Sequence, residues 1–564
     1  MILLNPQNYA GEHADPRSKD IMLKTINFFE NKGLAAIKKD DLDQTWYQDL
    51  LDFIRDEGVF ATLLTPSGYG AADSRFDLRR VCEYNEILAF YSLAYQYTYQ
   101  VSILGLGPIW MGDNEAIKHK TAQFLQQGGI FGFGLSEREH GADIYSTETA
   151  LFPTGDGTYR AQGSKYYIGN GNVAAIVSTF GKMAETGEYV FFGVSPEHEK
   201  YELVKQIRAS GGRQSYVAEY ALHDYPIAES DIISRGQLAW DSSLSTVNIG
   251  KFQLGFSTIG ICEHAFYEAI NHASQRTLYS QLVTDFPHVQ QMFTESYARL
   301  IAAKLFAWRA VDYFRSASDA DRRYLLFNPI QKMKVTSQGI RIVDTLLDII
   351  AAKGFEQETY FEMAIRDIGM IPRLEGTEHV NMALVIKFMR NYFFDPTPYP
   401  AIPKRDDPAD DAYIFEQKTG GLAKVKFPDY RLAYNGVDVA NAGVFQEQIE
   451  LFKKFLVQTT PTDEQVKNID YMLAVGELFT MIVYAQLCLE ATRIYPIDAG
   501  LLDQIFNFIV RDFSHYALEL LCKFINTPDQ ERNIRQMIVK PIINPAQSRR
   551  VWQEHVLSCG GQYV

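Results

Sequence analysis

Short runs of β-type residues between positions 131 and 244 separate two regions of helical patterning, and this alternation constrains the fold most. Before them, segments such as 21–29 and 80–97 carry apolar residues at helical spacing, with glycine and proline in the gaps. After them, helical patterning returns from about 246 to 394 in three or four long segments. The pattern therefore predicts helices, then a sheet, then helices again.

Length adds further parts to this order. With 564 residues the chain is too long for a single core. Five prolines between 394 and 412, together with the acidic pair Asp406 and Asp407, predict an extended and exposed linker. More helical patterning follows the linker. We predict an α+β, mainly α fold made of an N-terminal α-helical domain (1–130), a middle β-barrel or β-sandwich domain (131–244), an α-helical bundle (245–394), a linker (395–443) and an appended helical domain (444–564).

Composition and charge indicate the environment of the protein. The net charge of −15 disfavours nucleic acid and anionic lipid as partners, and we expect no stable membrane insertion. The five cysteines are scattered, without a Cys-x-x-Cys pair or a Cys/His cluster, so neither a disulfide framework nor a metal site is predicted. Reduced thiols, and an N-terminus that resembles neither a secretory signal nor a transit peptide, predict a cytoplasmic protein. The longest apolar stretch, 478–489, is shorter than the roughly 20 residues of a membrane span and predicts a buried helix.

Two segments at the start of the β-rich part carry candidate ligand-binding residues. The first covers 133–143 and contains Ser136, and the second covers 165–171 and contains Tyr167. A strand that ends in a serine and a glycine-containing turn can present N–H groups and a hydroxyl to a planar polar ring, and an aromatic residue can lie against that ring. Taken alone, the same residues are also typical of ordinary turns in a β-domain.

A third segment places Glu375, Gly376 and Thr377 behind the pair Arg366-Asp367, with Glu375 nine residues after the arginine. By itself, an acidic residue before Gly-Thr is most simply part of a turn or a helix N-cap.

Two cations stand at the ends of a predicted helix. Lys251 enters the helix that begins near residue 254, and Arg276 ends it. Each is, on composition alone, most simply a solvated surface charge.

In this order, the segments resemble the acyl-CoA dehydrogenase family. The family's Thr-Glu-Pro…Gly-Ser-Asp turn is matched by Ser136-Glu137-Arg138…Gly141-Ala142-Asp143, and its Lys-x-Trp-Ile-Thr-Asn-Gly strand by residues 165–171. Its Glu-Arg-x-x-Phe-Gly, Gly-Gly-x-Gly-Tyr and Arg-Asp-(x)7-Glu-Gly-Thr segments are matched by 275–280, 351–355 and 366–377. The resemblance covers roughly residues 20 to 395, and it depends on five matches in the right order and spacing.

The resemblance implies an FAD-dependent enzyme that desaturates an acyl-CoA thioester between Cα and Cβ. A thioester α-proton is only weakly acidic, so its removal needs a positioned base and an electrophilic grip on the carbonyl. By the resemblance, that base is Glu375, because the position that carries the base in other members is Gly250 here. The carbonyl would be held by the Glu375 N–H and a ribityl hydroxyl, while the β-hydride would pass to flavin N5.

The same resemblance assigns ligand contacts and partners. Arg276 would reach the FAD pyrophosphate, since a guanidinium pairs with phosphate oxygens bidentately. An electron-transfer flavoprotein would accept the electrons. The appended helices resemble the C-terminal extension of larger members, which implies a homodimer. The residues that would contact FAD are Phe133, Leu135, Ser136, Gly141, Ala142, Tyr167, Gly169, Arg276, Tyr279 and Thr377, and those that would contact acyl-CoA are Asn248, Lys251 and Gly376.

Several positions depart from the family pattern. Tyr167 and Gly169 replace a tryptophan and a threonine, and the second change removes a hydroxyl that the family directs at the flavin. Ala351 and Ala352 replace a Gly-Gly pair. These changes leave the electron acceptor and the acyl specificity open.

Two alternatives therefore stand beside the dehydrogenase. One is an acyl-CoA oxidase-like flavoenzyme that returns electrons to oxygen. The other is a non-catalytic FAD-binding relative that binds a partner such as DNA or another protein, although the mixed charge of 444–526 disfavours DNA. A flavin monooxygenase on the same fold would usually lack the glutamate, so the presence of Glu375 disfavours that class.

Overall fold

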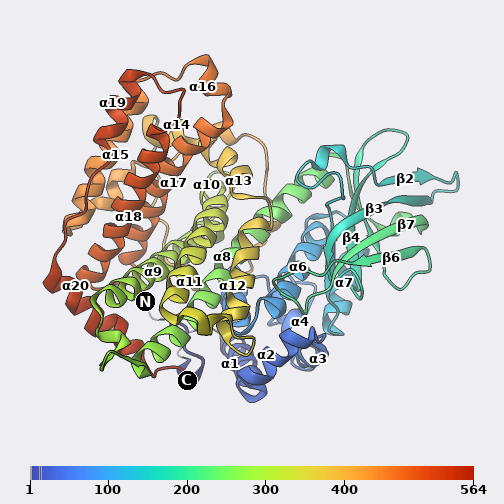
Figure 1. Ribbon diagram of the computed structural model, residues 1–564. Coiled ribbons are helices and arrows are strands. Elements are labelled where there is room, and N and C mark those ends of the chain that lie inside the picture. The colour runs from blue at the N-terminus through green and yellow to red at the C-terminus, as the bar shows by residue number, and fades with distance from the viewer. Residues whose placement is uncertain (1–2, 10, 12, 14) are drawn as a thin grey trace. The chain divides into compact units, whose positions relative to one another are not determined.

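The computed structural model describes residues 3–9, 11, 13 and 15–564, and the chain forms two compact units. One, the sheet unit, comprises Tyr9–Ile261 and Arg405–Gly420. The other, the helical unit, comprises Met1–Asn8, Cys262–Lys404 and Gly421–Val564. In Figure 1 the sheet unit is coloured mainly blue to green, and the helical unit mainly yellow-green to red.

Helices form the first part of the sheet unit. Pro16 stands in the first turn of its first helix, and the Asp15 side chain caps that turn by accepting a hydrogen bond from Ser18 N, the arrangement that favours a helix start. The helices are α1 (Pro16–Lys32), α2 (Leu34–Asp43), α3 (Gln48–Asp56), α4 (Val59–Leu64), α5 (Leu78–Tyr91), α6 (Leu93–Met111) and α7 (Glu115–Gln126).

Eight strands of the sheet unit belong to one hydrogen-bonded sheet. The order of seven of them is β6-β7-β3-β2-β4-β5-β8, and β1 pairs with β4 in parallel, with Phe133 opposite Ser178. Short 3₁₀ helices, η2 (Ile144–Ser146) and η3 (Glu229–Asp231), lie in two of the connections. The strands are β1 (Phe131–Gly134), β2 (Ala150–Pro153), β3 (Tyr159–Gly169), β4 (Ile176–Met183), β5 (Tyr189–Val194), β6 (Tyr201–Gln206), β7 (Val217–Ile227) and β8 (Ile232–Arg235).

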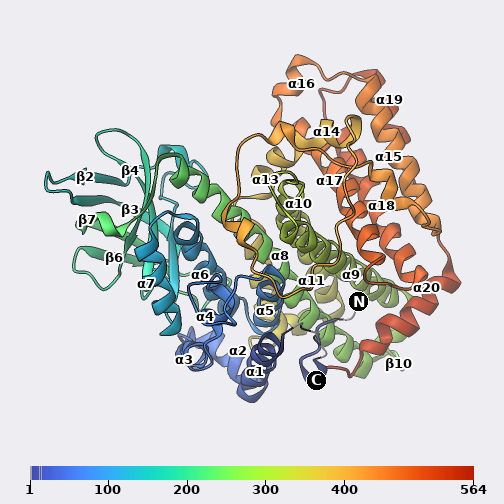
Figure 2. The ribbon, with the colours of Figure 1, turned by 180° about the vertical axis from the view of Figure 1, so that it is seen from behind.

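Helix α6 packs directly on the strand that carries the first candidate segment. All of its residues are buried, and a Cβ at Gly105 would lie 2.7 Å from the carbonyl oxygen of Gly132 in β1. Only glycine permits so close an approach of helix and strand backbones. Figures 1 and 2 show α6 beside the sheet. The helix therefore supports the end of β1, where the candidate residues begin.

The long helix α8 (Gly236–Gln275) follows β8, and its residues up to Ile261 belong to the sheet unit. The rest of the chain up to residue 404 belongs to the helical unit. Its elements are η1 (Pro6–Asn8), β9 (Thr277–Leu278), β10 (Gln281–Leu282), η4 (Val283–Asp285), α9 (Pro287–Arg315), α10 (Tyr324–Ile330), the π-helical turn η5 (Gln331–Val335), α11 (Thr336–Ile350), η6 (Ala351–Phe355), α12 (Tyr360–Met370), η7 (Ile371–Arg373), α13 (Glu378–Val385), η8 (Ile386–Phe388) and α14 (Met389–Phe394).

The end of the predicted linker (421–443) and the appended region (444–564) complete the helical unit. Helices α17 and α18 run side by side in Figures 1 and 2, and both pack against α9. The elements of these two parts are η10 (Leu422–Lys424), η11 (Tyr430–Tyr434), α15 (Ala440–Gln458), α16 (Asp463–Lys467), α17 (Ile469–Thr492), α18 (Ala499–Leu521), α19 (Pro528–Gln536), α20 (Pro545–Val551), the π-helical turn η12 (Trp552–Val556) and η13 (Leu557–Cys559).

Helix α17 is long and apolar enough to cross a membrane, with a mean hydropathy of 1.7 over its best window. However, 83% of that window is buried inside the protein. A helix that is apolar on every side belongs in a core when its neighbours cover it. The buried helix predicted for 478–489 is confirmed.

The predicted fold class is confirmed, because helices, a sheet, a helical bundle and further helices follow one another in the expected order. One boundary differs, since the strands end at Arg235 and α8 begins at Gly236, earlier than the predicted limits of 244 and 245. The first turns of α8 are rich in serine and carry little apolar repeat, so the helical pattern emerges late.

The linker predicted from composition is only partly exposed. Asp411, Ile414 and Gln417 are buried, and the 3₁₀ helix η9 (Ala412–Phe415) forms there. Within the sheet unit, the Asp411 carboxylate accepts a 2.7 Å hydrogen bond from Leu78 N at the start of α5. The segment is therefore partly buried where an exposed linker was predicted, because it makes tertiary contacts that its proline content does not reveal.

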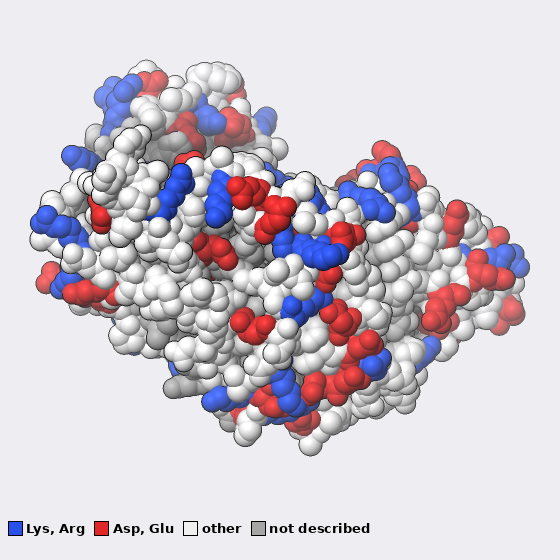
Figure 3. Space-filling view, turned by 60° about the horizontal axis from the view of Figure 1, so that its bottom comes forward, with Lys and Arg blue, Asp and Glu red and all other residues white. Residues whose placement is uncertain are grey.

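Charged side chains are spread over the surface. On the face in Figure 3, lysine and arginine alternate with aspartate and glutamate without a broad patch of one sign. The five cysteines are free thiols, of which Cys522 is exposed and the other four are buried.

Candidate active site

In the sheet unit, hydrogen bonds join the two candidate segments where β1 and β3 meet. Ser136 Oγ donates to Tyr166 O at 2.8 Å, and Tyr166 N donates to Ser136 O at 3.0 Å. Lys165 Nζ donates to Leu135 O at 3.1 Å. The structure therefore brings together the segments of Phe133, Leu135 and Ser136 with those of Tyr167 and Gly169, as a shared binding surface requires.

A buried ion pair fixes the loop that leaves β1. Lys165 Nζ lies 2.7 Å from Glu137 Oε1, and both side chains are almost inaccessible. Burial raises the pKa of Glu137, but the Lys165 charge and hydrogen bonds from Thr147 and Glu148 outweigh it and lower the pKa to about 2. Burial lowers the pKa of Lys165. Both residues occur in the segments that resemble the family, but their sequence pattern indicates no role; their burial shows that they hold this loop.

The end of β3 is shaped for close packing. Tyr167, next in sequence to the residue that pairs with Ser136, adopts a left-handed backbone conformation (φ 69°) and is 38% exposed, so its side chain is accessible. A Cβ at Gly169 would lie 2.7 Å from Val101 Cγ2 and 3.0 Å from the Tyr97 hydroxyl, both on α6. The threonine that the family has at 169 therefore has no room here, because side chains of α6 occupy its space.

We expect Gly169→Ala to destabilise the protein by about 1–3 kcal/mol, the usual effect of overpacking a filled site. Denaturant unfolding followed by circular dichroism measures the change. Gly141→Ala is the matched control, because the space around Gly141 is open. Equal stability of the two variants would contradict the prediction, because it would show that Val101 and Tyr97 of α6 can move aside at little cost.

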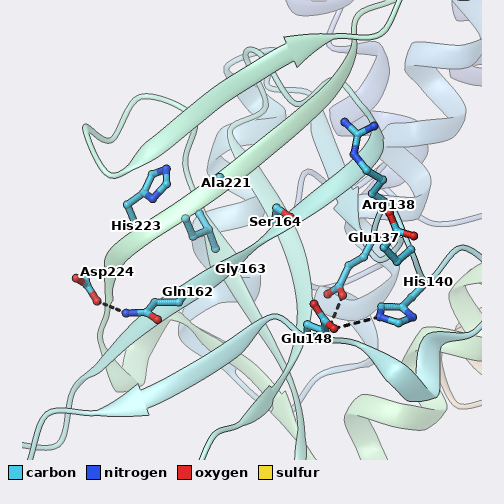
Figure 4. Close-up of a pocket in the computed structure, with 12 residues that line it drawn as sticks. Glu137, Arg138, His140, Glu148, Gln162, Gly163, Ser164, Ala221, His223 and Asp224 are labelled. Atoms are coloured by element: carbon cyan, nitrogen blue, oxygen red, sulfur yellow. Dashed lines mark hydrogen bonds and ion pairs between the residues drawn. The ribbon is translucent and has the colours of Figure 1, made fainter.

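Gly141 and Ala142 lie in an exposed stretch of the loop that follows β1. They take no part in the hydrogen bonds between Ser136 and Tyr166. Beside this loop is a hollow of about 500 Å³, which Figure 4 shows between β3, β7 and the loop. Its lining includes four carboxylates, and its one guanidinium, Arg138, is paired with Glu219. Such a lining disfavours the phosphates of a nucleotide ligand, so we do not place the cofactor in this hollow.

The two predicted acyl-CoA contacts on α8 differ in their surroundings. Asn248 is buried, and its Nδ2 donates to Gln417 Oε1 at 2.7 Å. Its amide therefore holds the 405–420 segment within the sheet unit. Lys251 is half-buried one turn later on the same helix.

In the helical unit, Glu375 lies in a tight turn between η7 and α13. Glu375 and Gly376 have φ values of 54° and 83°, two consecutive left-handed residues. A non-glycine residue in this conformation costs about 1–2 kcal/mol, and such strain is concentrated at functional sites. Thr377 takes the N-cap position of α13 without a side-chain cap bond, and it is exposed. The turn thus presents a half-buried carboxylate and an exposed hydroxyl two residues apart.

A second carboxylate, Glu378, stands three residues further on. Burial and the nearby Glu477 raise its pKa, and Lys334 opposes the shift. Sequence reasoning identified no competitor to Glu375, and Glu378 is one that the structure adds. Glu477, which contributes to this pKa shift, lies on α17, whereas Glu375 belongs to the turn.

Basic side chains gather at the C-terminal end of α8. Arg276 Nη1 lies 3.4 Å from His272 Nε2. Burial lowers the pKa of His272, and the charges of Lys353 and Arg276 lower it further, although Glu268 partly compensates. This group is suited to a phosphate-bearing ligand. Lys353 is a member that the sequence did not single out.

Tyr279 lies at the tip of the short β9–β10 hairpin, three residues after Arg276. It is 92% exposed and has a φ of 50°. The hairpin begins where α8 ends, and Val283 N closes it by donating to Arg276 O at 2.9 Å. The candidate residues are thus divided between the units: Glu375, Gly376, Thr377, Arg276 and Tyr279 belong to the helical unit, and the others belong to the sheet unit.

Comparisons with known proteins show what this fold is similar to. A family model described as "Acyl-CoA dehydrogenase, C-terminal domain" matches residues 240–389. The short-chain specific acyl-CoA dehydrogenase of Megasphaera elsdenii is 21% identical over 64% of this chain and 95% of its own length. The mitochondrial very long-chain specific acyl-CoA dehydrogenase of Rattus norvegicus is 24% identical over 64% of this chain and 56% of its own.

A solved structure extends the similarity to the appended helices. An acyl-CoA dehydrogenase from Bacillus anthracis, crystallised with FAD, superposes with a TM-score of 0.78 at 17% identity. The match covers 99% of this chain and 97% of that one. The comparisons therefore support the resemblance to the acyl-CoA dehydrogenase family: the family model matches residues 240–389, and the fold matches over the whole chain.

Proposed function

We propose that this protein is an FAD-dependent acyl-CoA dehydrogenase in which Glu375 removes the α-proton of an acyl-CoA thioester. The observation that carries the proposal is the turn of Glu375 and Gly376, two left-handed residues at the start of α13 in the register of the family's Glu-Gly-Thr segment. A base must be held in place by its backbone, and this turn holds one carboxylate.

The residues of the turn have complementary tasks. The Glu375 carboxylate accepts the α-proton, and the adjoining backbone N–H polarises the thioester carbonyl as negative charge develops on its oxygen. When bound, FAD supplies the acceptor for the hydride that leaves Cβ. Gly376 keeps the turn free of a side chain beside the substrate.

The residues present suit FAD. In the sheet unit, Ser136 and the accessible ring of Tyr167 would hold the flavin, and exposed Gly141 and Ala142 would allow the backbone close to it. In the helical unit, the family resemblance assigns FAD contacts to the exposed Thr377 and to Arg276, whose basic neighbours suit a pyrophosphate. The remaining predicted contacts are Phe133, Leu135, Gly169 and Tyr279.

We expect Arg276→Ala to weaken FAD binding about 10- to 100-fold, since a charge-assisted hydrogen bond contributes about 1.5–3 kcal/mol. Equilibrium titration of the apoprotein with FAD gives the dissociation constant without any turnover. Arg390→Ala, at an exposed arginine of the same unit, is the control. Unchanged affinity in the Arg276 variant would remove this residue from the cofactor site.

Anaerobic mixing of the FAD-loaded protein with short, long, branched and aromatic acyl-CoAs tests the proposed function. We expect at least one thioester to bleach the flavin absorbance and to yield the α,β-unsaturated product. A fully FAD-loaded protein that none of the thioesters bleaches would contradict the proposal. Turnover with a ferrocenium acceptor, compared with peroxide release in air, separates a dehydrogenase from an oxidase.

We further propose an electron-transfer flavoprotein as the electron acceptor, a homodimer and a cytoplasmic location. The first two follow from the family resemblance, and the third is supported by the scattered free cysteines. Light scattering of the purified protein measures the oligomeric state.

A further inference from the structure

Two lysines in the π-helical turn η5 are fully buried. Lys332 and Lys334 have no exposed surface, and all five residues of the turn lie in the interior of the helical unit. A π-helical turn departs from regular α-helical hydrogen bonding and often marks a functional site. A buried ammonium needs partners that compensate for lost hydration, so the contacts of each lysine indicate its task.

Lys332 holds the backbone of the turn that carries Glu375. Its Nζ donates to Pro372 O at 2.5 Å and also to Gly376 O. These two carbonyls lie on either side of Glu375 in the chain. One ammonium therefore binds the backbone both before and after the residue that carries the carboxylate. Asn381 Nδ2 also donates to Gly376 O, at 3.2 Å. Hydrogen bonds from a charged donor are stronger than neutral ones, which suits a turn that must keep a non-glycine residue left-handed.

Lys334 holds the appended helices. Its Nζ lies 3.0 Å from Glu477 Oε2 on α17 and 2.9 Å from the Tyr516 hydroxyl on α18. The same ammonium lies 4.5 Å from the centroid of the Tyr516 ring, within the range of a cation–π interaction. The two lysines are two residues apart on one turn, but one binds the Glu375 segment and the other binds the appended region.

The appended region also touches the helix that follows Glu375. At Gly476 of α17, a Cβ would lie 2.5 Å from Met382 Sδ of α13. Thr480 Oγ1 lies 3.6 Å from the same sulfur. The absence of a side chain at Gly476 therefore allows α17 to lie directly against α13.

We propose that Lys332 is a positioning residue for Glu375 and that the appended helices keep Lys332 in place by anchoring Lys334. The proposal takes the role of Glu375 from the proposed function, but the contacts themselves are independent of that role. It assigns the appended region a task in the reaction, namely to hold the proton-accepting carboxylate in register.

Hydrogen–deuterium exchange of the FAD-loaded protein tests the first part. In Lys332→Met we expect the backbone amides of 371–381 to exchange at least about tenfold faster, the factor that one lost charge-assisted bond produces. We also expect flavin reduction to slow at saturating acyl-CoA, with little change in KM. Lys332→Arg, which keeps the charge, should recover part of both effects, whereas Lys454→Met at an exposed lysine of α15 should change neither. Parental exchange of 371–381 in folded Lys332→Met would overturn the assignment.

Variants of the appended region test the second part. Glu477→Gln and Tyr516→Phe leave the Lys332 contacts intact, and we expect both to speed exchange at 371–381 and to slow flavin reduction, less than Lys332→Met does. Exchange in that segment equal to the parent would refute the anchoring role.

If Lys332→Met does not fold, Lys332→Gln, which keeps an N–H donor without the charge, tests the same contact. Faster exchange in Lys332→Met, together with normal reduction in Glu375→Gln, would uphold the contact and reject the proposed function.

Discussion

Replacing Glu375 with glutamine is expected to leave a folded, yellow protein. We expect its flavin to be reduced by acyl-CoA far more slowly than in the parent. Glutamine keeps the shape of the side chain but cannot accept the α-proton, and the loss of a positioned base typically slows such a step by about 10²–10⁴-fold. Anaerobic stopped-flow mixing of the FAD-loaded variant with a bleaching thioester measures the rate.

Two further variants make this result specific. Glu356→Gln changes an exposed acid of the same unit and should leave the rate unchanged. Glu378→Gln changes the second carboxylate near the turn and should slow reduction far less than Glu375→Gln. The reverse order of effects would transfer the role of base to Glu378, and a parental rate in Glu375→Gln would falsify proton transfer to this residue.

The largest effect on stability is expected at a buried ion-pair network that joins α18 to α9 and α11. Asp512 receives two hydrogen bonds from the Arg299 guanidinium, at 2.7 and 2.9 Å, and a third contact of 2.7 Å from Arg341. Asp512→Asn leaves the buried Arg299 with less compensation, and breaking such a pair costs about 3–5 kcal/mol. Denaturant unfolding of the variant measures this loss. Asp529→Asn, at an exposed ion pair on α19, should cost no more than about 1 kcal/mol.

The same network has a defined pH dependence. Burial alone would raise the pKa of Asp512, but Arg299 and Arg341 outweigh it, so the folded-state pKa lies below its usual value. A carboxylate with a depressed folded pKa contributes stability that is fully present above its unfolded value of about 3.9 and is lost as the pH falls below it. The stability difference between the parent and Asp512→Asn should therefore stay constant near neutral pH and shrink in acid. A difference that grows below pH of about 4 would contradict this assignment.

The order of secondary structure could be predicted because helices and strands place apolar residues at different periods. The same signal failed where burial depends on distant partners. Gln417 lies in a segment whose prolines suggest exposure, yet it is buried by a contact with Asn248, 169 residues earlier in the chain. The polar first turns of α8 gave no periodic signal, so its start was predicted too late.

At the site, the spacing of Glu375 behind Arg366 and Asp367 predicted the glutamate, but it did not predict the residues that hold its turn in place. Lys332 and Lys334 occur in a helical pattern where lysine usually indicates a solvated face. Their burial follows from the π-helical turn and from partners on η7, α17 and α18, none of which is visible locally. The lack of space at Gly169 likewise depends on α6, whose Val101 and Tyr97 fill it.

The one exposed thiol offers a way to watch the appended helices directly. Cys522 directly follows the last residue of α18, and the other four thiols, including Cys82, are buried. Burial raises the pKa of Cys559 to about 12 and raises the pKa of Cys262 and of Cys488 above its usual range. Thiolates rather than thiols react with maleimides, so a fluorescent maleimide should label the native protein at Cys522 alone. The dye would lie beside the ion pair of Lys523 and Asp470, which joins the segment after α18 to α17, and its anisotropy would report loosening of these helices in real time.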